Sequence, residues 1–204
     1  MSRGLPRAYD VVIPTADDVL AAAIDAHGPL DPLRAQKLLY YAQAWHLAWY
    51  GEPMFDDTIE AWSYGPVVAS VWHRYKALGR GQIVTPTAGD PDALDDRRLR
   101  SLCAVLEAYG HLSGPELVRL THAEGPWRQA RGTDDDLADG NTPISRETMS
   151  SFYRDSAVFG GHRSKPEEID DTLRESVLSG DTGALTSLFE KHLGVLVESV
   201  EAIS

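Results

Sequence analysis

Apolar residues are densest between Asp31 and Val68, in the segment DPLRAQKLLYYAQAWHLAWYGEPMFDDTIEAWSYGPVV. Its first half predicts a helix, because Asp31 can cap the start, Pro32 suits the first turn and Gly51 can close the end. The apolar residues cover most of the helix circumference: Leu38, Leu39, Tyr40, Tyr41, Ala42, Ala44, Trp45, Leu47 and Trp49. Such a helix is buried on several sides, so we expect it at the centre of the domain.

A short strand pattern follows this helix. Residues Thr58 to Tyr64 alternate in a way that is typical of a half-exposed β-strand. We expect Gly65 and Pro66 to end the strand and to open a helix over residues 67–78. The apolar face of that helix would comprise Val67, Val71, Tyr75 and Leu78. Residues 79–92 are rich in Gly, Pro and Thr and predict an exposed connection.

Capping signals mark three further helices. The residues at their starts are Thr15 with Asp18, Ser113 with Glu116, and Ser145 with its flanking Ile144 and Met149. Together these elements predict a mainly α fold: a compact helical domain with a small antiparallel β element and a C-terminal amphipathic helical extension. Gly160-Gly161 is the best boundary signal. We therefore expect a domain over residues 1–155 and an acidic helical extension over 156–204.

The charge is distributed unevenly. The chain has a formal net charge of −12, and from Pro166 onward nine acidic residues stand against only Arg174 and Lys191. This excess of acid makes nucleic acid an unlikely partner, because binding phosphates needs surplus Lys and Arg. No apolar run approaches the roughly 20 residues of a membrane span, and the N-terminus has no apolar signal core. We therefore expect a cytoplasmic protein that does not contact a membrane.

Two local patterns predict structural rather than chemical roles. Cys103, the only cysteine, lies on a helical apolar stripe and is interpreted as a core thiol. A single cysteine also excludes an internal disulfide and a cysteine-rich zinc site. The cluster Arg97, Arg98 and Arg100 follows Asp95 and Asp96, which favours a solvated helix start.

Candidate reactive motifs are incomplete. His122 and Glu124 form an H-x-E pair without the P-C-x-x-C element of zinc deaminases. The histidines lack the i, i+4 pair of a helical zinc site, and Gly79-Arg80-Gly81 lacks the G-K-[ST] of a P-loop. The acidic run 134–139 lacks the terminal glutamate of an EF-hand and is interpreted as a solvated loop. We expect no catalytic residues, no metal and no cofactor.

Aromatic residues at Gly-Pro turns are the remaining candidates for a site. Trp62 and Tyr64 precede Gly65-Pro66, and Trp127 follows Gly125-Pro126. These side chains either fasten the turns to the core or present stiff aromatic surface to a partner protein, where Trp and Tyr are favoured anchors. Both interpretations are open. The candidate partner-binding residues of the domain are Trp62, Tyr64, Pro66 and Trp127.

Three separated motifs resemble one known family. The helix segment Ala35–Pro53, the turn segment EAWSYGPVV at Glu60–Val68 and LTHAEGPW at Leu120–Trp127 occur in the order found in the Panacea antitoxin domain family, which includes SocA-like and phage-associated GepA-like proteins. The resemblance covers roughly Ala16 to Arg154. It implies an antitoxin that neutralises a cognate toxin protein by direct binding. Some relatives instead deliver the toxin to a protease complex, and an enzyme of unknown type or a DNA-binding autoregulator are further alternatives.

The extension is the part of the chain that the resemblance does not cover. In residues 183–203 the apolar positions recur at helical spacing and most acidic residues lie elsewhere on the circumference. Its candidate partner-binding residues are Leu185, Phe189, Leu196 and Val200. This face packs either on the chain's own domain or on a second copy in a homo-oligomer, or else it docks the toxin while the acid speeds encounter with a basic partner.

Overall fold

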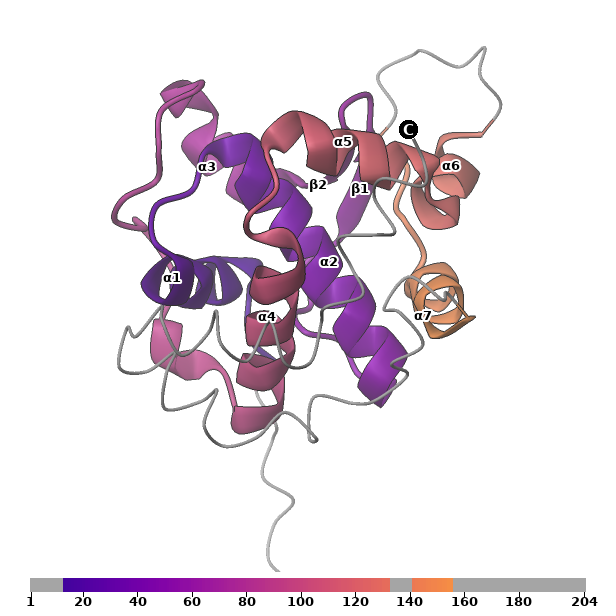
Figure 1. The fold of residues 1–204 in the computed structure, drawn as a ribbon, viewed down its shortest axis with the longest axis horizontal. Coiled ribbons are helices and arrows are strands. Elements are labelled where there is room, and N and C mark those ends of the chain that lie inside the picture. Colours follow the sequence, from indigo (N-terminus) through magenta and orange to yellow (C-terminus); the bar gives the residue numbers. More distant parts are fainter. Residues whose placement is uncertain (1–12, 133–140, 156–204) are drawn as a thin grey trace, which may run out of the picture.

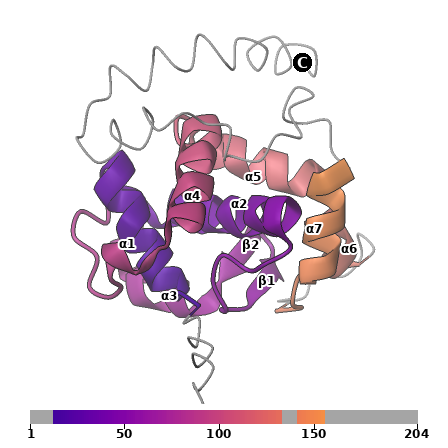
Figure 2. The same cartoon turned by 90° about the horizontal axis from the view of Figure 1, so that it is seen from below.

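Helix α2 (Pro32–Tyr50) is the centre of the fold. The computed structural model describes residues 13–132 and 141–155. Figures 1 and 2 both show α2 running between α1 (Ala16–His27) on one side and α7 (Arg146–Asp155) on the other. The Asp31 carboxylate accepts hydrogen bonds from the backbone N–H groups of Leu33 and Arg34, and Gly51 closes the helix with a left-handed φ of 71°. Fourteen of its nineteen residues are buried. The predicted central helix is confirmed.

The other helices pack around α2, and three of them begin at the caps predicted at Thr15, Ser113 and Ser145. Thr15 and Asp18 form a complete capping box for α1, as do Ser113 and Glu116 for α5. The elements are α1 (Ala16–His27), α3 (Ala69–Tyr75), α4 (Asp96–Tyr109), α5 (Gly114–Ala123), α6 (Gly125–Arg131), α7 (Arg146–Asp155) and the 3₁₀ turns η1 (Lys76–Leu78) and η2 (Pro91–Ala93). The predicted mainly α class is therefore confirmed.

The helix expected from Val67 onward is wrong at its start. Strand β1 (Ile59–Trp62) pairs antiparallel with a second strand, β2 (Gly65–Val68), through a turn at Ser63 and Tyr64. Gly65 adopts a φ of +95°, which suits the turn. Val67 is buried as part of the strand, whereas Leu78 falls in η1 and is 43% exposed. The β-branched Val67-Val68 pair favours extended backbone at this point.

Both outer edges of this hairpin are covered. On the β1 edge, Ala61 N–H donates to the Thr142 carbonyl and Ile144 N–H donates to the Ile59 carbonyl, at 2.9 and 2.8 Å. On the β2 edge the partners are side chains of α2. Gln36 Oε1 accepts from Val68 N–H at 2.7 Å, and Lys37 Nζ donates to the Pro66 carbonyl at 2.9 Å. Pro66 lies two residues before Val68 on β2, so its backbone nitrogen points to the same outer edge. The missing N–H of proline therefore removes no hydrogen bond between the two strands.

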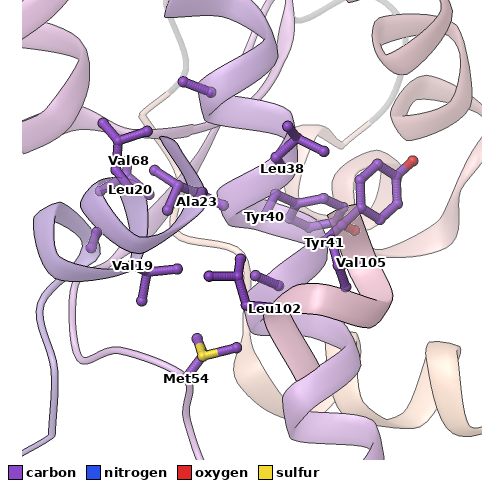
Figure 3. Packing of buried hydrophobic residues seen from close by; sticks show 14 of the residues in the cluster. Val19, Leu20, Ala23, Leu38, Tyr40, Tyr41, Met54, Val68, Leu102 and Val105 are labelled. Carbon is purple, nitrogen blue, oxygen red and sulfur yellow. The ribbon is translucent and has the colours of Figure 1, made fainter. Parts of the chain in front are cut away.

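The main core lies where α1, α2 and α4 meet. Figure 3 shows side chains from these helices packed with the loop residue Met54 and with Val68 of β2. Trp45 of α2 is buried in the same cluster. The prediction of a solvated helix start is wrong for Arg98. Its side chain is only 4% exposed and donates hydrogen bonds to the carbonyls of Met54 and Pro53 and to the Asp95 carboxylate. The aliphatic part of an arginine side chain can be buried when the guanidinium group has hydrogen-bond partners.

No helix among residues 13–132 and 141–155 is long and apolar enough to cross a membrane. The connection over residues 79–92 is mostly exposed, as expected, with the exception of Ile83, which pairs with Leu30. The acidic run 134–139 and the extension with Leu185, Phe189, Leu196 and Val200 lie outside the described residues. The expected division at residue 155 stays a prediction.

Candidate partner-binding groove

A groove with a volume of about 1070 Å³ lies beside the hairpin turn. We call it the hairpin groove. Its walls come from the start of α2, the hairpin, α3 and the loop after it, and the start of α5. The lining residues are Asp31, Leu33, Gln36, Lys37, Trp62, Ser63, Tyr64, Val67, Trp72, Gly79, Arg80, Gly114, Pro115 and Asn141. The groove therefore collects residues that are far apart in the sequence.

Aromatic side chains dominate the open part of the hairpin groove. Tyr64 at the hairpin turn is 74% exposed. Trp62 and Trp72 are half-buried and meet edge to face, with ring centroids 6.3 Å apart. The Trp62 indole N–H donates to Glu60 Oε2 at 2.7 Å, which fixes the orientation of the ring. The groove thus presents rigid aromatic surface, and the indole N–H of Trp62 already has its hydrogen-bond partner within the chain.

Buried polar residues hold the hairpin in place below the groove. Lys37 is fully buried, and its ammonium donates to the Pro66 carbonyl. Burial lowers the pKa of Lys37 from 10.5 to about 7. Because Lys37 has no solvent-exposed surface, it supports the groove floor and does not reach a ligand. The neighbouring Gln36, bonded to Val68, acts in the same way.

Gly65 is the point of closest approach between the hairpin and its support. A Cβ atom at this position would come within 2.8 Å of both Lys37 Nζ and Thr121 Oγ1. Its positive φ also disfavours any L side chain. Glycine at position 65 therefore allows the β2 backbone to lie directly on Lys37.

Trp127 is part of α6 and contacts strand β1 of the hairpin. Its indole N–H donates to the Trp62 carbonyl at 2.9 Å, and its ring stacks on His122 with centroids 4.0 Å apart. The Arg131 guanidinium lies over the Trp127 ring, with its Cζ atom 6.0 Å from the ring centroid. The structure therefore brings Trp62 and Tyr64 together in the groove. It places Trp127 behind the hairpin and Pro66 in the buried strand.

Comparison with known proteins agrees with this arrangement of motifs. The family model described as "Antitoxin SocA-like, Panacea domain" matches residues 35–128, which include most of α2, the hairpin and most of the groove lining. The chain is 31% identical to the Antitoxin SocA of Caulobacter vibrioides (strain NA1000 / CB15N) over 169 residues, covering 76% of this chain and 86% of that protein. The chain belongs to the SocA-like Panacea antitoxin family. No solved structure matches it.

In this Panacea antitoxin, sequence reasoning missed Trp72, Leu33 and Arg80 as groove residues. A signal existed for Trp72, because Val71 and Tyr75 form the buried stripe of α3 and Trp72 lies off that stripe. A large apolar side chain that faces away from the core is a candidate for contact with another molecule. Leu33 and Arg80 carry no comparable signal, because only the tertiary fold brings them to the hairpin.

A second buried polar cluster lies away from the groove, at Glu124 between α5 and α6. The Glu124 carboxylate accepts hydrogen bonds from the hydroxyls of Tyr41, at 3.0 Å, and Tyr153. Burial raises the pKa of Glu124 to about 7, although the two hydroxyls act in the opposite direction. The Tyr41 ring also stacks on Tyr109 of α4 at 3.9 Å. This cluster ties α7 to α2 and α4 and is closed to solvent.

The described part of this Panacea antitoxin offers little for metal or thiol chemistry. Within residues 13–132 and 141–155 no three His, Cys, Asp or Glu side chains gather closely enough to hold a metal ion. Burial, with Glu107 as a second cause, raises the pKa of the Cys103 thiol to about 12. Cys103 is thus protonated at neutral pH and is a poor nucleophile. It is half-buried and lies outside the core cluster, so the predicted core position is not confirmed.

Proposed function

We propose that this Panacea antitoxin neutralises a cognate toxin protein by direct binding, and that the hairpin groove is the surface that contacts the toxin. The observation that carries the proposal is the aromatic group of the exposed Tyr64 and the half-buried Trp62 and Trp72 in the groove lining. Trp and Tyr are the residue types that most often dominate the energy of protein–protein interfaces. Residues of this kind on a rigid support bind with little loss of conformational entropy.

The groove suits a protein segment better than a substrate. Its volume of about 1070 Å³ lies just above the range of about 300–1,000 Å³ that is typical of small-molecule sites. Of the three described groups whose pKa is shifted to about 7, Glu107 lies outside the groove lining, whereas Lys37 and Glu124 are buried and hydrogen-bonded. Neither can accept or donate a proton to a molecule in the groove. These features support non-enzymatic binding as the mode of action.

Substitutions in the groove test the proposal. Tyr64→Ala and Trp72→Ala should each weaken binding to the toxin by about 10- to 100-fold, the loss that is typical of a central aromatic anchor. Binding is measured by isothermal titration calorimetry with the purified cognate toxin, and protection by growth of cells that express that toxin. Circular dichroism confirms that each variant is folded.

Val84→Ala is the matched control. Val84 is 65% exposed, close to the exposure of Tyr64, and lies outside the groove lining. It should leave both the dissociation constant and the protection unchanged. The groove would be excluded as the toxin site if Tyr64→Ala and Trp72→Ala bound and protected like Val84→Ala.

A further inference from the structure

The segment Leu120–Trp127, which carries the last of the three family motifs, lines no part of the hairpin groove. Two of its side chains, His122 and Trp127, lie behind the hairpin together with Arg131 of α6. We call these three residues the hairpin clamp. The proposed function leaves the clamp without a role, because none of its residues belongs to the groove lining.

The clamp bonds to the backbone on both sides of the Trp62 Cα atom. Arg131 Nη1 donates to the Ala61 carbonyl at 3.4 Å, and the Trp127 indole N–H donates to the Trp62 carbonyl at 2.9 Å. The first carbonyl belongs to the peptide plane before Trp62 and the second to the plane after it. A residue has only two soft backbone dihedrals, which the two flanking peptide planes define. The clamp therefore fixes the direction in which the Trp62 side chain leaves the backbone.

The direction of this side chain matters for the groove. The Trp62 indole N–H donates to Glu60, and the ring meets Trp72 edge to face in the groove lining. Because an indole ring extends far from the backbone, a small change in φ or ψ of Trp62 displaces the ring relative to Trp72. A binding surface keeps its shape only when its side chains are held by supporting contacts of this kind.

His122 contributes to the clamp by stacking. Its ring lies flat on Trp127, with an interplanar angle of 8° and ring centroids 4.0 Å apart. Its Nε2 atom is buried and has no hydrogen-bond partner among the described residues. Burial lowers the pKa of His122, and the neighbouring cations Lys37 and Arg131 act in the same direction. The imidazole is therefore neutral at pH 7 and holds Trp127 through an uncharged ring contact.

We infer that Trp127 and Arg131 are positioning residues, which set the orientation of Trp62 for the partner protein and do not touch that partner themselves. His122 supports them by holding the Trp127 ring. The inference rests on the proposed function, since it names the support of one wall of the same groove. The orientation of Trp62 is a property of the free chain, however, so it can be measured without a toxin.

Fluorine NMR of the full chain labelled with 5-fluorotryptophan tests the clamp directly. The chain has five tryptophans, and single Trp→Phe variants assign their signals. Trp127→Phe retains an aromatic ring and removes the N–H that the Trp62 carbonyl accepts. We expect the Trp62 signal to shift or to divide in two, and the Trp72 signal to shift with it. Arg131→Met should displace the same signals. A Trp62 signal that stays in place in both variants would overturn the inference.

Trp49→Phe is the matched control. Trp49 is half-buried like Trp127 and packs on Trp45. It lies about 18 Å along α2 from Lys37, the residue that bonds to the hairpin. Its substitution should leave the Trp62 signal unchanged. A Trp62 shift of equal size in this control would show that the loss of any indole has the same effect, and would also overturn the inference.

Binding to the cognate toxin separates a positioning role from a general loss of stability. Trp127→Phe should weaken binding about fivefold, the size of one lost hydrogen bond. In a chain that already carries Trp62→Ala it should have no further effect, because Trp127 acts only through that ring. A fivefold loss in both backgrounds would contradict the inference, as would no loss where Tyr64→Ala does weaken binding. If Tyr64→Ala binds normally, the proposed function fails, while the NMR result still decides the role of the clamp.

Discussion

Lys37 has an unusual environment for a lysine, because the whole side chain is buried with a single carbonyl as its partner. Its pKa is about 7 in the folded chain and near 10.5 when the chain unfolds. Between these values the unfolded chain binds more protons, so the free energy of unfolding rises with pH in this window. We expect a rise of about 3 kcal/mol between pH 7 and 9.5 from this residue.

Lys37→Met should remove that rise, because methionine fills a similar volume and has no proton to lose. Urea denaturation of both proteins at several pH values measures the difference. Lys76→Met is the control, since Lys76 is exposed, and its pH profile should match that of the unaltered chain. A profile for Lys37→Met that still rises as steeply would show that Lys37 is not buried as described.

Gly65→Ala should destabilise the fold more than an ordinary glycine substitution. The new Cβ would meet Lys37 and Thr121 at 2.8 Å, in addition to the cost of a positive φ. Gly28→Ala separates these two causes, because Gly28 has a φ of +94° and no atom within 4 Å of the added Cβ. We expect Gly65→Ala to cost about 1–3 kcal/mol more than Gly28→Ala in thermal or urea unfolding. Equal losses of stability in the two variants would mean that the Lys37 side chain moves away from the new Cβ without an energetic cost.

Among the elements, α7 depends on the buried contact between Tyr153 and Glu124. Tyr153→Phe keeps the ring and removes the hydroxyl that Glu124 accepts from, so a buried carboxylate loses one of its two partners. We expect a loss of about 1–3 kcal/mol in the free energy of unfolding. Tyr64→Phe, at an exposed position, should cost nothing measurable. A neutral Tyr153→Phe would indicate that water replaces the missing hydroxyl.

The elements also show where sequence reasoning succeeds. Helix α2 could be predicted because its caps and its all-round apolar pattern are local signals. Strand β2 could not, because Gly65-Pro66 suits a helix start as well as a strand. What decides between them is the pair Gln36 and Lys37, which bond to the strand from about thirty residues away. Trp62 and Tyr64 could be named from the sequence as candidates because they precede a Gly-Pro turn, whereas the groove that they line depends on tertiary contacts.

At the scale of the whole molecule, a binding antitoxin must occupy its target. Titration of the cognate toxin with the full chain should therefore give a break in toxin activity near an equimolar ratio. The activity of the toxin at each ratio is the measurement. Full neutralisation far below equimolar amounts, in a purified mixture without a protease, would contradict stoichiometric binding. The same result only in the presence of a protease would indicate delivery of the toxin for degradation.

The covered edges of the hairpin determine what kind of recognition this surface can use. Because Gln36 and Lys37 occupy one edge and residues 142–144 the other, a partner cannot extend the sheet through backbone hydrogen bonds. On the proposed function, recognition at the hairpin therefore depends on side chains such as Tyr64 and Trp72. Exposed side chains can be exchanged during evolution at little cost to folding. A lineage can accordingly acquire a new toxin partner through a few point substitutions while its backbone stays the same.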